Sequence, residues 1–518
     1  VRLALGDTAR ARAEYDTYLK LFAEGADAER VRVQFAALPA PAPVAVRPEK
    51  PAEAPQITAS IAQTWFGGQS KTLTELKDTP LEGQIPQIVS AETLSGTDQN
   101  QFVTSLDFGW RHRDRTRDLR FVFRDTFTAE GMANRPSRNR LTALYVDYKA
   151  LPNGLTGRLG RQSGLGGGVL GRFDGATVGW TFPSRWKITG VLGQPTDALL
   201  DAKRHFYGLA VDTEALLPGL GAGTYLIEQK IDGEVDRRAV GLELRYFRPN
   251  ANVFSIFEAD TVMHTLNIAS VTGTFMTEGN STFNVLYDRR ATPLSMLGNA
   301  LFFPDPAATT FPRSIRDLLT TRTLEQLRQT VQDTTAYTTQ GTAGFTTPLN
   351  ERWQVGLDAR FTAIGEILPV PTVLPAGLAP SRATTVGVQG IGTNLYSQRD
   401  THVLNVSYLT GHNSANRFLP DSPQNQAMDY SGWLASYNNL SVPWANWQFE
   451  PSIRFYSQTT TSGIRTLRIT PGLRLTWRFR PGWSLESDLN LEQSKTTGPS
   501  QNESATRAYY YLGYRFDL

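Results

Sequence analysis

Through most of the chain, apolar and polar side chains alternate along extended segments. Near Trp477, for example, Leu473 and Leu475 share one face of an extended chain with it, whereas Arg474 and Arg478 lie on the opposite face. Successive side chains of a β-strand point to opposite faces, so this pattern predicts strands with one apolar and one polar face. Such long, regularly alternating strands are unusual for a soluble sandwich and are typical of a transmembrane β-barrel.

The connections between these segments alternate between tight and long. Tight connections are predicted at Asp114-Arg115, Pro152-Asn153, Pro183-Ser184, Pro218-Gly219, Pro249-Asn250, Thr277-Glu278, Pro348-Leu349, Gln398-Arg399, Val442-Pro443 and Arg480-Pro481. Longer connections are predicted at 69–99, 129–138, 164–172, 196–202, 290–334, 365–381, 412–425 and 496–504. Outer-membrane barrels have short periplasmic turns and longer extracellular loops, so both termini are expected in the periplasm.

The count of strands follows from these connections. It predicts an antiparallel up-and-down barrel of about 22 strands, with about 20 as the alternative. The two counts differ in the treatment of the first strand, at 57–68, and in the division of 380–411. A soluble β-propeller would need a blade-length repeat, and none is visible in the sequence.

The first part of the chain has a different period. In residues 1–38, apolar side chains recur at helical spacing in two segments, from Ala11 to Phe22 and from Val31 to Leu38. Two short helices cannot bury their apolar faces alone, so they are predicted to be the last unit of a tetratricopeptide-like repeat array. Earlier repeats would then precede Val1, and an isolated helical hairpin is the alternative.

A Pro- and Ala-rich segment, residues 39–56, follows the helices. Such a segment forms a semi-rigid extended linker and marks a domain boundary. The barrel is therefore predicted to occupy residues 57–518. The linker leaves no room for a folded plug domain before the barrel, which disfavours ligand-gated uptake.

Composition excludes several function classes. The chain has no Cys, which excludes a disulfide scaffold, a thiolate metal site and a cysteine nucleophile. A net charge of +3 is too small for a nucleic-acid-binding protein of this length. The five His residues are far apart, and the glycine run at 164–168 is not followed by the Lys-Ser/Thr of a phosphate-binding loop. No Ser–His pair stands out, so neither an enzyme nor a cofactor is predicted.

Charged residues on the polar face of the predicted strands are the candidate lining of the lumen. They are Arg120, Arg124, Asp147, Lys149, Glu243, Arg245, Arg468, Arg474, Arg478, Glu486, Asp488 and Glu492. Two interpretations stay open. The side chains form a cross-strand ladder of ion pairs that holds the wall together, or they form a polar, partly basic conduit for hydrated or anionic cargo.

The long connection at 290–334 contains a segment with helical spacing, residues 313–333. Its candidate gate residues are Ile315, Leu318, Leu319, Leu324, Leu327 and Val331. An amphipathic helix must bury its apolar face, so this segment is expected to cap the barrel, to fold into it as a gate, or to pack on an external partner. Residues 69–99 are expected to behave similarly.

The C-terminal residues alternate up to the end of the sequence. Tyr511, Gly513, Phe516 and Leu518 resemble the terminal signal that the barrel-assembly machinery recognises. The resemblance implies that this machinery is a partner of the chain. Insertion into outer-membrane lipid would follow.

Helical repeats followed by an outer-membrane barrel resemble the exporters of bacterial exopolysaccharide systems, namely the cellulose, poly-N-acetylglucosamine and Pel outer-membrane subunits. The shared features are residues 1–38, the linker and the barrel. The segment from Gly160 to Gly175 is also similar to segments of uncharacterised repeat-containing barrel proteins. The resemblance implies that the repeats bind periplasmic partners and that the barrel passes a polysaccharide. Those barrels have about 16 strands, fewer than are predicted for this chain.

The sequence therefore predicts a bacterial outer-membrane channel that exports a polymer. The alternatives are a structural sheath, whose lumen holds a partner protein, and a general porin. A wide barrel without a plug would leave a large open pore in the outer membrane. A partner protein that fills the lumen would prevent leakage through it, which is the reason for considering the sheath.

Overall fold

The computed structural model describes Tyr15, Val31 and residues 54–78, 85–164, 166–303, 311–370, 374, 376–419 and 426–518. The chain divides into two units, Val1–Ala54 and Pro55–Leu518. In the first unit, Tyr15 and Val31 are both helical. The predicted helical hairpin at 1–38 and the linker at 39–56 otherwise lie almost wholly outside the described residues.

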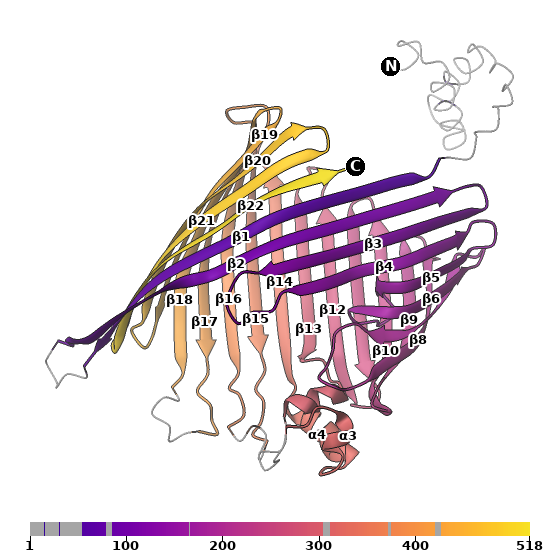
Figure 1. Ribbon diagram of the computed structural model, residues 1–518, viewed down its shortest axis with the longest axis horizontal. Helices are drawn as coiled ribbons and strands as arrows, with labels where there is room; N and C mark the ends of the chain where they lie inside the picture. The colour runs from indigo at the N-terminus through magenta and orange to yellow at the C-terminus, as the bar shows by residue number, and fades with distance from the viewer. Residues whose placement is uncertain are drawn as a thin grey trace. The chain divides into compact units, whose positions relative to one another are not determined.

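The second unit is a β-barrel of 22 strands (Figure 1). The first eleven are β1 (Gln56–Lys77), β2 (Ile88–Arg113), β3 (Arg117–Glu130), β4 (Arg138–Ala150), β5 (Leu155–Ser163), β6 (Arg172–Thr181), β7 (Trp186–Pro195), β8 (Arg204–Leu217), β9 (Leu220–Ile231), β10 (Glu234–Arg248) and β11 (Ala251–Asp260). The others are β12 (Thr265–Met276), β13 (Thr282–Thr292), β14 (Ala336–Pro348), β15 (Trp353–Ile364), β16 (Ser381–Thr393), β17 (Asp400–Asn413), β18 (Met428–Trp444), β19 (Trp447–Thr460), β20 (Arg465–Arg480), β21 (Trp483–Thr497) and β22 (Gln501–Asp517).

The barrel is closed and its topology is up-and-down. Each strand pairs antiparallel with the next strand along the chain. The ring closes where β22 pairs with β1, from Ser60 opposite Asp517 to Leu76 opposite Gln501. Closure leaves the sheet without a first and a last edge, as a membrane-spanning sheet requires. The predicted barrel and its larger strand count are confirmed.

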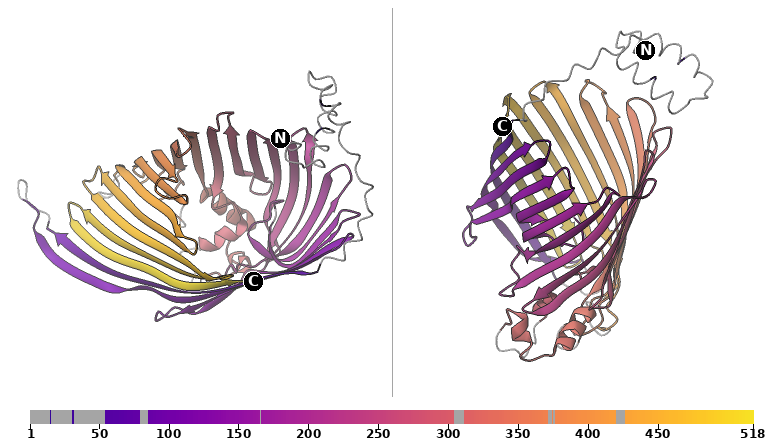
Figure 2. Two further views of the ribbon diagram at one scale, coloured as in Figure 1. Left: turned by 90° about the horizontal axis from the view of Figure 1, so that it is seen from above. Right: turned by 90° about the vertical axis from the view of Figure 1, so that its right-hand side faces the viewer.

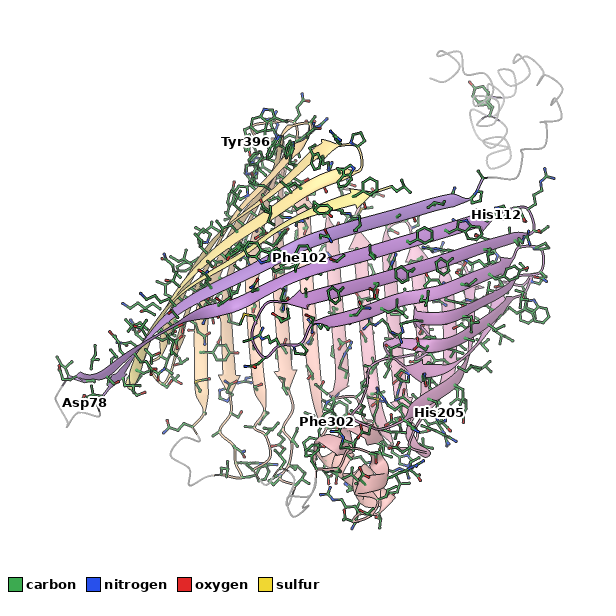
Figure 3. The ribbon with its side chains drawn as sticks, viewed as in Figure 1. Asp78, Phe102, His112, His205, Phe302 and Tyr396 are labelled. Atoms are coloured by element: carbon green, nitrogen blue, oxygen red, sulfur yellow. The ribbon has the colours of Figure 1, made fainter. Side chains whose placement is uncertain are left out.

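The two ends of the barrel differ in their connections. At one end, here called the turn end, β1 begins, β22 ends, and the connections are 114–116, 151–154, 182–185, 218–219, 249–250, 277–281, 349–352, 394–399, 445–446 and 481–482. At the other, here called the loop end, they include 131–137, 164–171, 196–203, 293–335, 365–380 and 414–427. Figure 3 marks the turn end by His112 and Tyr396 and the loop end by Asp78 and Phe302.

Three predicted connections were wrong. Residues 69–99 are mostly strand, because β1 continues to Lys77 and β2 begins at Ile88. The connection at 496–504 shrinks to three residues between Thr497 and Gln501. Val442-Pro443 lies inside β18, where the register shifts between Ser441 and Trp444. Proline is tolerated at such a bulge, so it did not mark the turn.

The outer face of the barrel is apolar and its turn end carries aromatic rings. Trp447 stacks on Trp477 with ring centroids 5.2 Å apart, and Trp483 lies against Phe516 at 4.7 Å. Tryptophan is typical of the interface between membrane and water, so these rings belong to an aromatic girdle. Strands β6 and β7, of 10 residues each, match the length that a tilted strand needs to cross a bilayer. Among the described residues, no helix is long and apolar enough to cross a membrane.

The connection between β13 and β14 carries helices at the loop end. They are the 3-10 helix η2 (Leu297–Phe302), α3 (Ile315–Leu318) and α4 (Leu324–Asp333). Both α-helices begin with a capping box, at Ser314 and at Thr323. Seen from the turn end, α3 and α4 appear within the ring of strands (Figure 2), and Figure 1 places them at the loop end. They therefore cover part of that opening.

Candidate functional site

The polar face of the strands carries ion pairs between neighbouring strands. On β20, Arg474 lies 3.3 Å from Glu486 of β21, and Arg468 lies 3.6 Å from Glu492. Glu492 also accepts a hydrogen bond from Arg507 of β22, at 2.9 Å. These positions alternate with exposed apolar side chains, as antiparallel pairing in register requires. The arrangement is a cross-strand ladder of alternating charges.

Two further predicted residues of this region lie close to the ladder. Asp488 is opposite Arg474 in the register of β20 and β21, and its carboxylate accepts a hydrogen bond from Asn490. Arg478 lines a groove at the turn end together with Asp517. Positive and negative groups are therefore interleaved along this wall.

The predicted charges of the first strands are also distributed in pairs. Arg124 of β3 lies 2.5 Å from Asp107 of β2, and Arg120 is the register neighbour of Asp147. Asp147 itself forms an ion pair with Arg158 of β5, at 2.9 Å. The Arg158 guanidinium also lies over the ring of Tyr145, 4.5 Å from its centroid.

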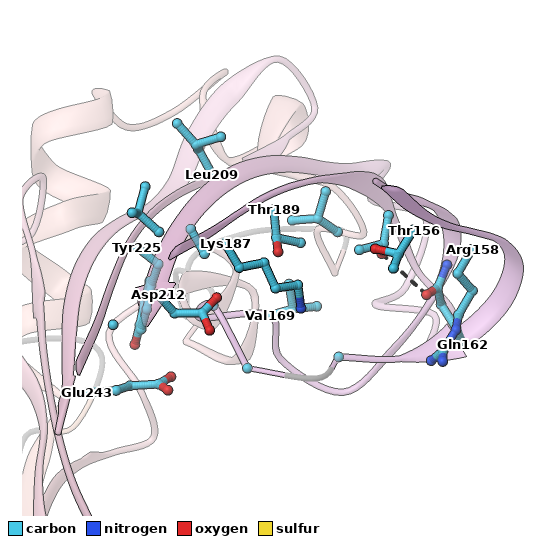
Figure 4. A pocket seen from close by; sticks show the side chains of 18 of the residues that line it. Thr156, Arg158, Gln162, Val169, Lys187, Thr189, Leu209, Asp212, Tyr225 and Glu243 are labelled. Carbon is cyan, nitrogen blue, oxygen red and sulfur yellow. Dashed lines mark hydrogen bonds between the residues drawn. The ribbon is translucent and has the colours of Figure 1, made fainter. Parts of the chain in front are cut away.

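The remaining predicted wall residues meet at a single pocket. Asp147, Lys149, Glu243 and Arg245 all line a cavity of ≈ 370 Å³ between strands β4–β10 and the connection 164–171. Lys187, Asp212 and Tyr225 line it as well, and these were not singled out from the sequence. Figure 4 shows Lys187, Asp212 and Glu243 around Val169 of this connection.

The connection 164–171, here called the lumen loop, folds against the inner wall. A methyl group added at Gly167 would lie 3.4 Å from Ala210, and one added at Gly166 would lie 3.6 Å from Glu243. Gly168 is closer still, because an added methyl carbon there would lie 2.4 Å from the ring of Tyr225. Glycine is the residue that permits such an approach of backbone to wall. The expected glycine-rich loop is therefore a constriction of the barrel near its loop end.

A buried polar cluster fixes the lumen loop in place. The Arg237 guanidinium donates a hydrogen bond to the backbone carbonyl of Gly168, at 3.0 Å. Arg237 and Glu258 form an ion pair at 2.5 Å, and both side chains are only 1% exposed. The Tyr225 hydroxyl donates to Glu258 at 2.7 Å, and Asn267 also contacts this carboxylate. A buried charge pair needs such additional hydrogen bonds to offset its loss of hydration.

Alternation in the sequence places these anchoring residues on the polar face, but it does not show that they contact one another. Arg237 has the same parity as Glu243 and Arg245, and the pairing of β10 with β9 is uninterrupted from Arg237 to Tyr246. In the pairing of β10 with β11, Glu258 is opposite Gly241, on the same face as Arg237. Glu258 precedes the shift between Glu258 and Ala259 of β11. Which residues of neighbouring strands meet depends on the register, and no short-range sequence signal gives that register here.

The candidate gate residues pack on the rim of the barrel itself. Ile315, Leu318, Leu327 and Val331 form one buried core with the residues Ile231, Met263, Leu297, Ala300 and Leu301, while Leu319 and Leu324 pack on its edge. The Gln332 amide donates to the backbone carbonyl of Met263 at 2.7 Å, and the Gly298 amide donates to Asp236 at 2.7 Å. The helices are thus a fixed cap on the β9–β10 and β11–β12 connections.

Electrostatic contacts also hold this cap to the barrel. Arg313 hydrogen-bonds both carboxylate oxygens of Asp201, in the β7–β8 connection, and lowers the pKa of that carboxyl. The backbone amide of Arg313, followed by the Ser314 hydroxyl, lowers the pKa of Asp317. All four residues lie outside the membrane-spanning strands.

The C-terminal residues of the expected assembly signal complete the closing strand. Tyr511 and Gly513 pair with Phe66 and Thr64 of β1, on the polar face. Phe516 belongs to the aromatic girdle, and the Leu518 amide donates to the Ala59 carbonyl at 2.8 Å. The last residue is therefore tied into the seam between β22 and β1.

In the described part of the chain, no group of three or more acidic or histidine side chains could hold a metal ion. A scan against protein-family models and a search of curated proteins give no match.

Solved structures of outer-membrane barrels are similar to this chain at low sequence identity. A bacterial polysaccharide outer membrane secretin is 11% identical, with a TM-score of 0.30, covering 64% of this chain and 97% of its own. OpdK of Pseudomonas aeruginosa, solved with vanillate, is 10% identical, with a TM-score of 0.37 and coverages of 89% and 99%. OccAB2 of Acinetobacter baumannii is 8% identical, with a TM-score of 0.39 and coverages of 89% and 98%. Because these TM-scores are low, the functional conclusion rests on the geometry of the barrel.

Proposed function

We propose that this barrel is an outer-membrane channel that exports a hydrated polar polymer such as an exopolysaccharide. The observation that carries the proposal is the lumen wall, where ion pairs such as Arg474–Glu486 line a closed barrel of 22 strands. A wall of paired charges attracts water but offers a passing sugar chain no large apolar surface on which to adhere. Because β22 pairs with β1 over 17 consecutive positions, the seam offers no opening to the side, and cargo would have to move along the axis of the barrel.

The dimensions suit a polymer. With strands spaced about 4.8 Å apart and tilted by about 40°, a circular barrel of this strand number has a backbone diameter of about 40 Å. The lumen loop and the cap occupy part of this width. The remaining passage would hold an extended, hydrated sugar chain while limiting leakage through the membrane.

The orientation is part of the proposal. The turn end faces the periplasm, so the N-terminal helices and the C-terminus lie there and the cap lies at the cell surface. The helices would recruit the periplasmic synthesis proteins that supply the polymer. The barrel-assembly machinery would recognise the C-terminal strand during insertion into outer-membrane lipid.

A general porin is the second candidate, and the lumen loop is the observation that favours it. A loop held against the inner wall narrows the passage to a size that would sort small solutes. A sheath whose lumen holds a partner protein is a third possibility, in which the polar wall would contact protein.

Planar-bilayer conductance of the full chain, with oligosaccharides of graded length added to the periplasmic side, tests the proposal. A polymer channel predicts current blocks that lengthen with chain length, and recovery of long saccharides on the other side. A porin predicts a sharp size limit, beyond which neither blocks nor passage occur, and this result would overturn the export proposal.

Mass spectrometry of the complex extracted from native membranes in mild detergent separates the sheath from both channels. A stoichiometric protein held in the lumen, with high conductance only after its removal, would overturn the channel proposal. Co-purification of polysaccharide or its synthesis proteins would support it.

A further inference from the structure

A row of basic side chains crosses the outer face of the barrel at the loop end. Arg289 of β13 is opposite Thr339 of β14, and Ala363 of β15 is opposite Arg382 of β16. The row continues to His412 of β17, which is opposite Arg382. Thr339 and Ala363 are themselves register partners, so the five residues form one continuous line across five strands.

Alternation places this row on the lipid-facing side. On β13, Arg289 has the same parity as Val285 and Tyr287, which are both exposed apolar or aromatic residues. On β16, Arg382 shares its face with the exposed Val386 and Val388. The basic row therefore continues the apolar outer surface toward the loop end.

The row lines a groove of ≈ 590 Å³. Its wall contains Arg289, Arg382, His412, Tyr337, Thr339, Ser381 and Ser414 together with the backbone near Gly365 and Pro380, and no Asp or Glu lines it. In the described part of the chain, neither arginine has a carboxylate within ion-pair distance. The Arg289 guanidinium lies over the Tyr337 ring, 4.7 Å from its centroid. The nearby Asp429 pairs with His412 at 2.6 Å, at the far end of the row.

The position of the groove decides which anion it fits. Two arginines three strands apart are separated by about 14 Å along the wall, and their long side chains can reach a shared or a doubly charged group. Guanidinium groups bind phosphate through parallel hydrogen bonds. Ser381 and Ser414 line the same groove, and their hydroxyl groups can complete such a contact. On the outer face, just beyond the apolar band, the anions within reach are the headgroups of membrane lipids.

We propose that this groove binds the phosphate groups of an anionic lipid headgroup in the leaflet at the loop end. A bound lipid would cover the unpaired arginines and fix the barrel beside β13–β17. The site faces away from the lumen, so the proposal does not depend on which cargo the channel carries.

The test uses the full chain in nanodiscs of phosphatidylethanolamine doped with lipid A, which carries phosphates on a sugar headgroup. Retained lipid A is measured by native mass spectrometry for the wild type and for the double variant Arg289→Gln/Arg382→Gln. Two cations at a membrane surface together contribute a factor of about 30 in affinity, which is the expected loss. The matched control is Arg360→Gln, which removes an arginine from the same wall but on the lumen face, beside Asp358.

Two further arms distinguish the sources of phosphate. Lipid A stripped of its phosphates is expected to bind no better to the wild type than to the double variant. Inorganic phosphate is expected not to displace the lipid, because it lacks acyl chains in the membrane.

Three outcomes would each overturn the proposal: equal lipid A retention by wild type and double variant, an equal loss in Arg360→Gln, or displacement of the lipid by inorganic phosphate. Both arginines are exposed, so the variants are expected to fold, and a heat-dependent gel shift checks this.

Discussion

Replacing Gly168 with alanine is expected to release the lumen loop and widen the channel. The φ angle of Gly168 is +74°, in the left-handed region, and an added methyl carbon would lie 2.4 Å from the Tyr225 ring. Tyr225 cannot move aside easily, because it is 3% exposed and its hydroxyl donates to the buried Glu258. The loop is therefore the part that must move.

The magnitudes support this outcome. Alanine in the left-handed region costs roughly 1–2 kcal/mol. Forcing a methyl group into a packed contact costs a further ~1–3 kcal/mol. The loop's charged anchor, the hydrogen bond from Arg237 to the Gly168 carbonyl, contributes about 1.5–3 kcal/mol. The penalty for keeping the substituted loop in place thus equals or exceeds the anchor that holds it there.

Single-channel conductance in planar bilayers is the assay, with Gly171→Ala as the matched control. Gly171 has a similar φ of +69°, but an added methyl carbon there meets no atom within 4 Å. The control therefore carries the backbone strain without the clash with Tyr225. We expect a higher conductance for Gly168→Ala and a wild-type conductance for Gly171→Ala. Equal conductance of Gly168→Ala and the wild type, or an equal rise in the control, would refute the assignment of this loop as the constriction.

Three other perturbations follow from the same geometry. Arg237→Met leaves the carboxylate of Glu258 buried without a cation, so the free energy of unfolding measured in urea should fall by about 3–5 kcal/mol. The control Arg238→Met, on the outer face, should change this free energy by less than about 1 kcal/mol. The pKa of Asp201 is lowered in the folded protein, so its ion pair with Arg313 stabilises the cap fully above the unfolded pKa of about 3.9. This stabilisation is lost as the pH falls through the lower folded pKa. Pepsin should therefore cleave the cap of the wild type faster as the pH falls across that range, and Asp201→Asn should remove this pH dependence. Leu489→Arg, on the lipid face, should destabilise the barrel in vesicles by about 2–4 kcal/mol, and an equally large loss for Asn490→Arg, on the lumen face, would contradict the assignment of faces.

Much of the fold could be predicted because its rules are local. Side-chain alternation on β20 shows which face meets lipid without any knowledge of the neighbouring strand. Turn residues such as Pro481 and Gly482 mark connections through their own backbone preferences. Where these signals failed, the cause was also physical. Residues 69–77 and 88–99 carry only scattered apolar side chains, such as Leu73 and Leu76 on opposite faces of β1, so a paired hairpin there resembled a loop.

The sequence alone determined a transmembrane barrel of about 22 strands, with about 20 as the alternative, the polar character of its lumen and the helical content of the β13–β14 connection. Only the tertiary structure decided that the lumen loop is held inside by Arg237, that α4 is buried on the rim, and that Arg289 and Arg382 share one outward groove. The reason is that alternation follows from one strand at a time, whereas these contacts depend on the register between strands and on how the connections pack. Register joins residues far apart in the chain, and a shift of one residue would have turned each of these side chains to the opposite face.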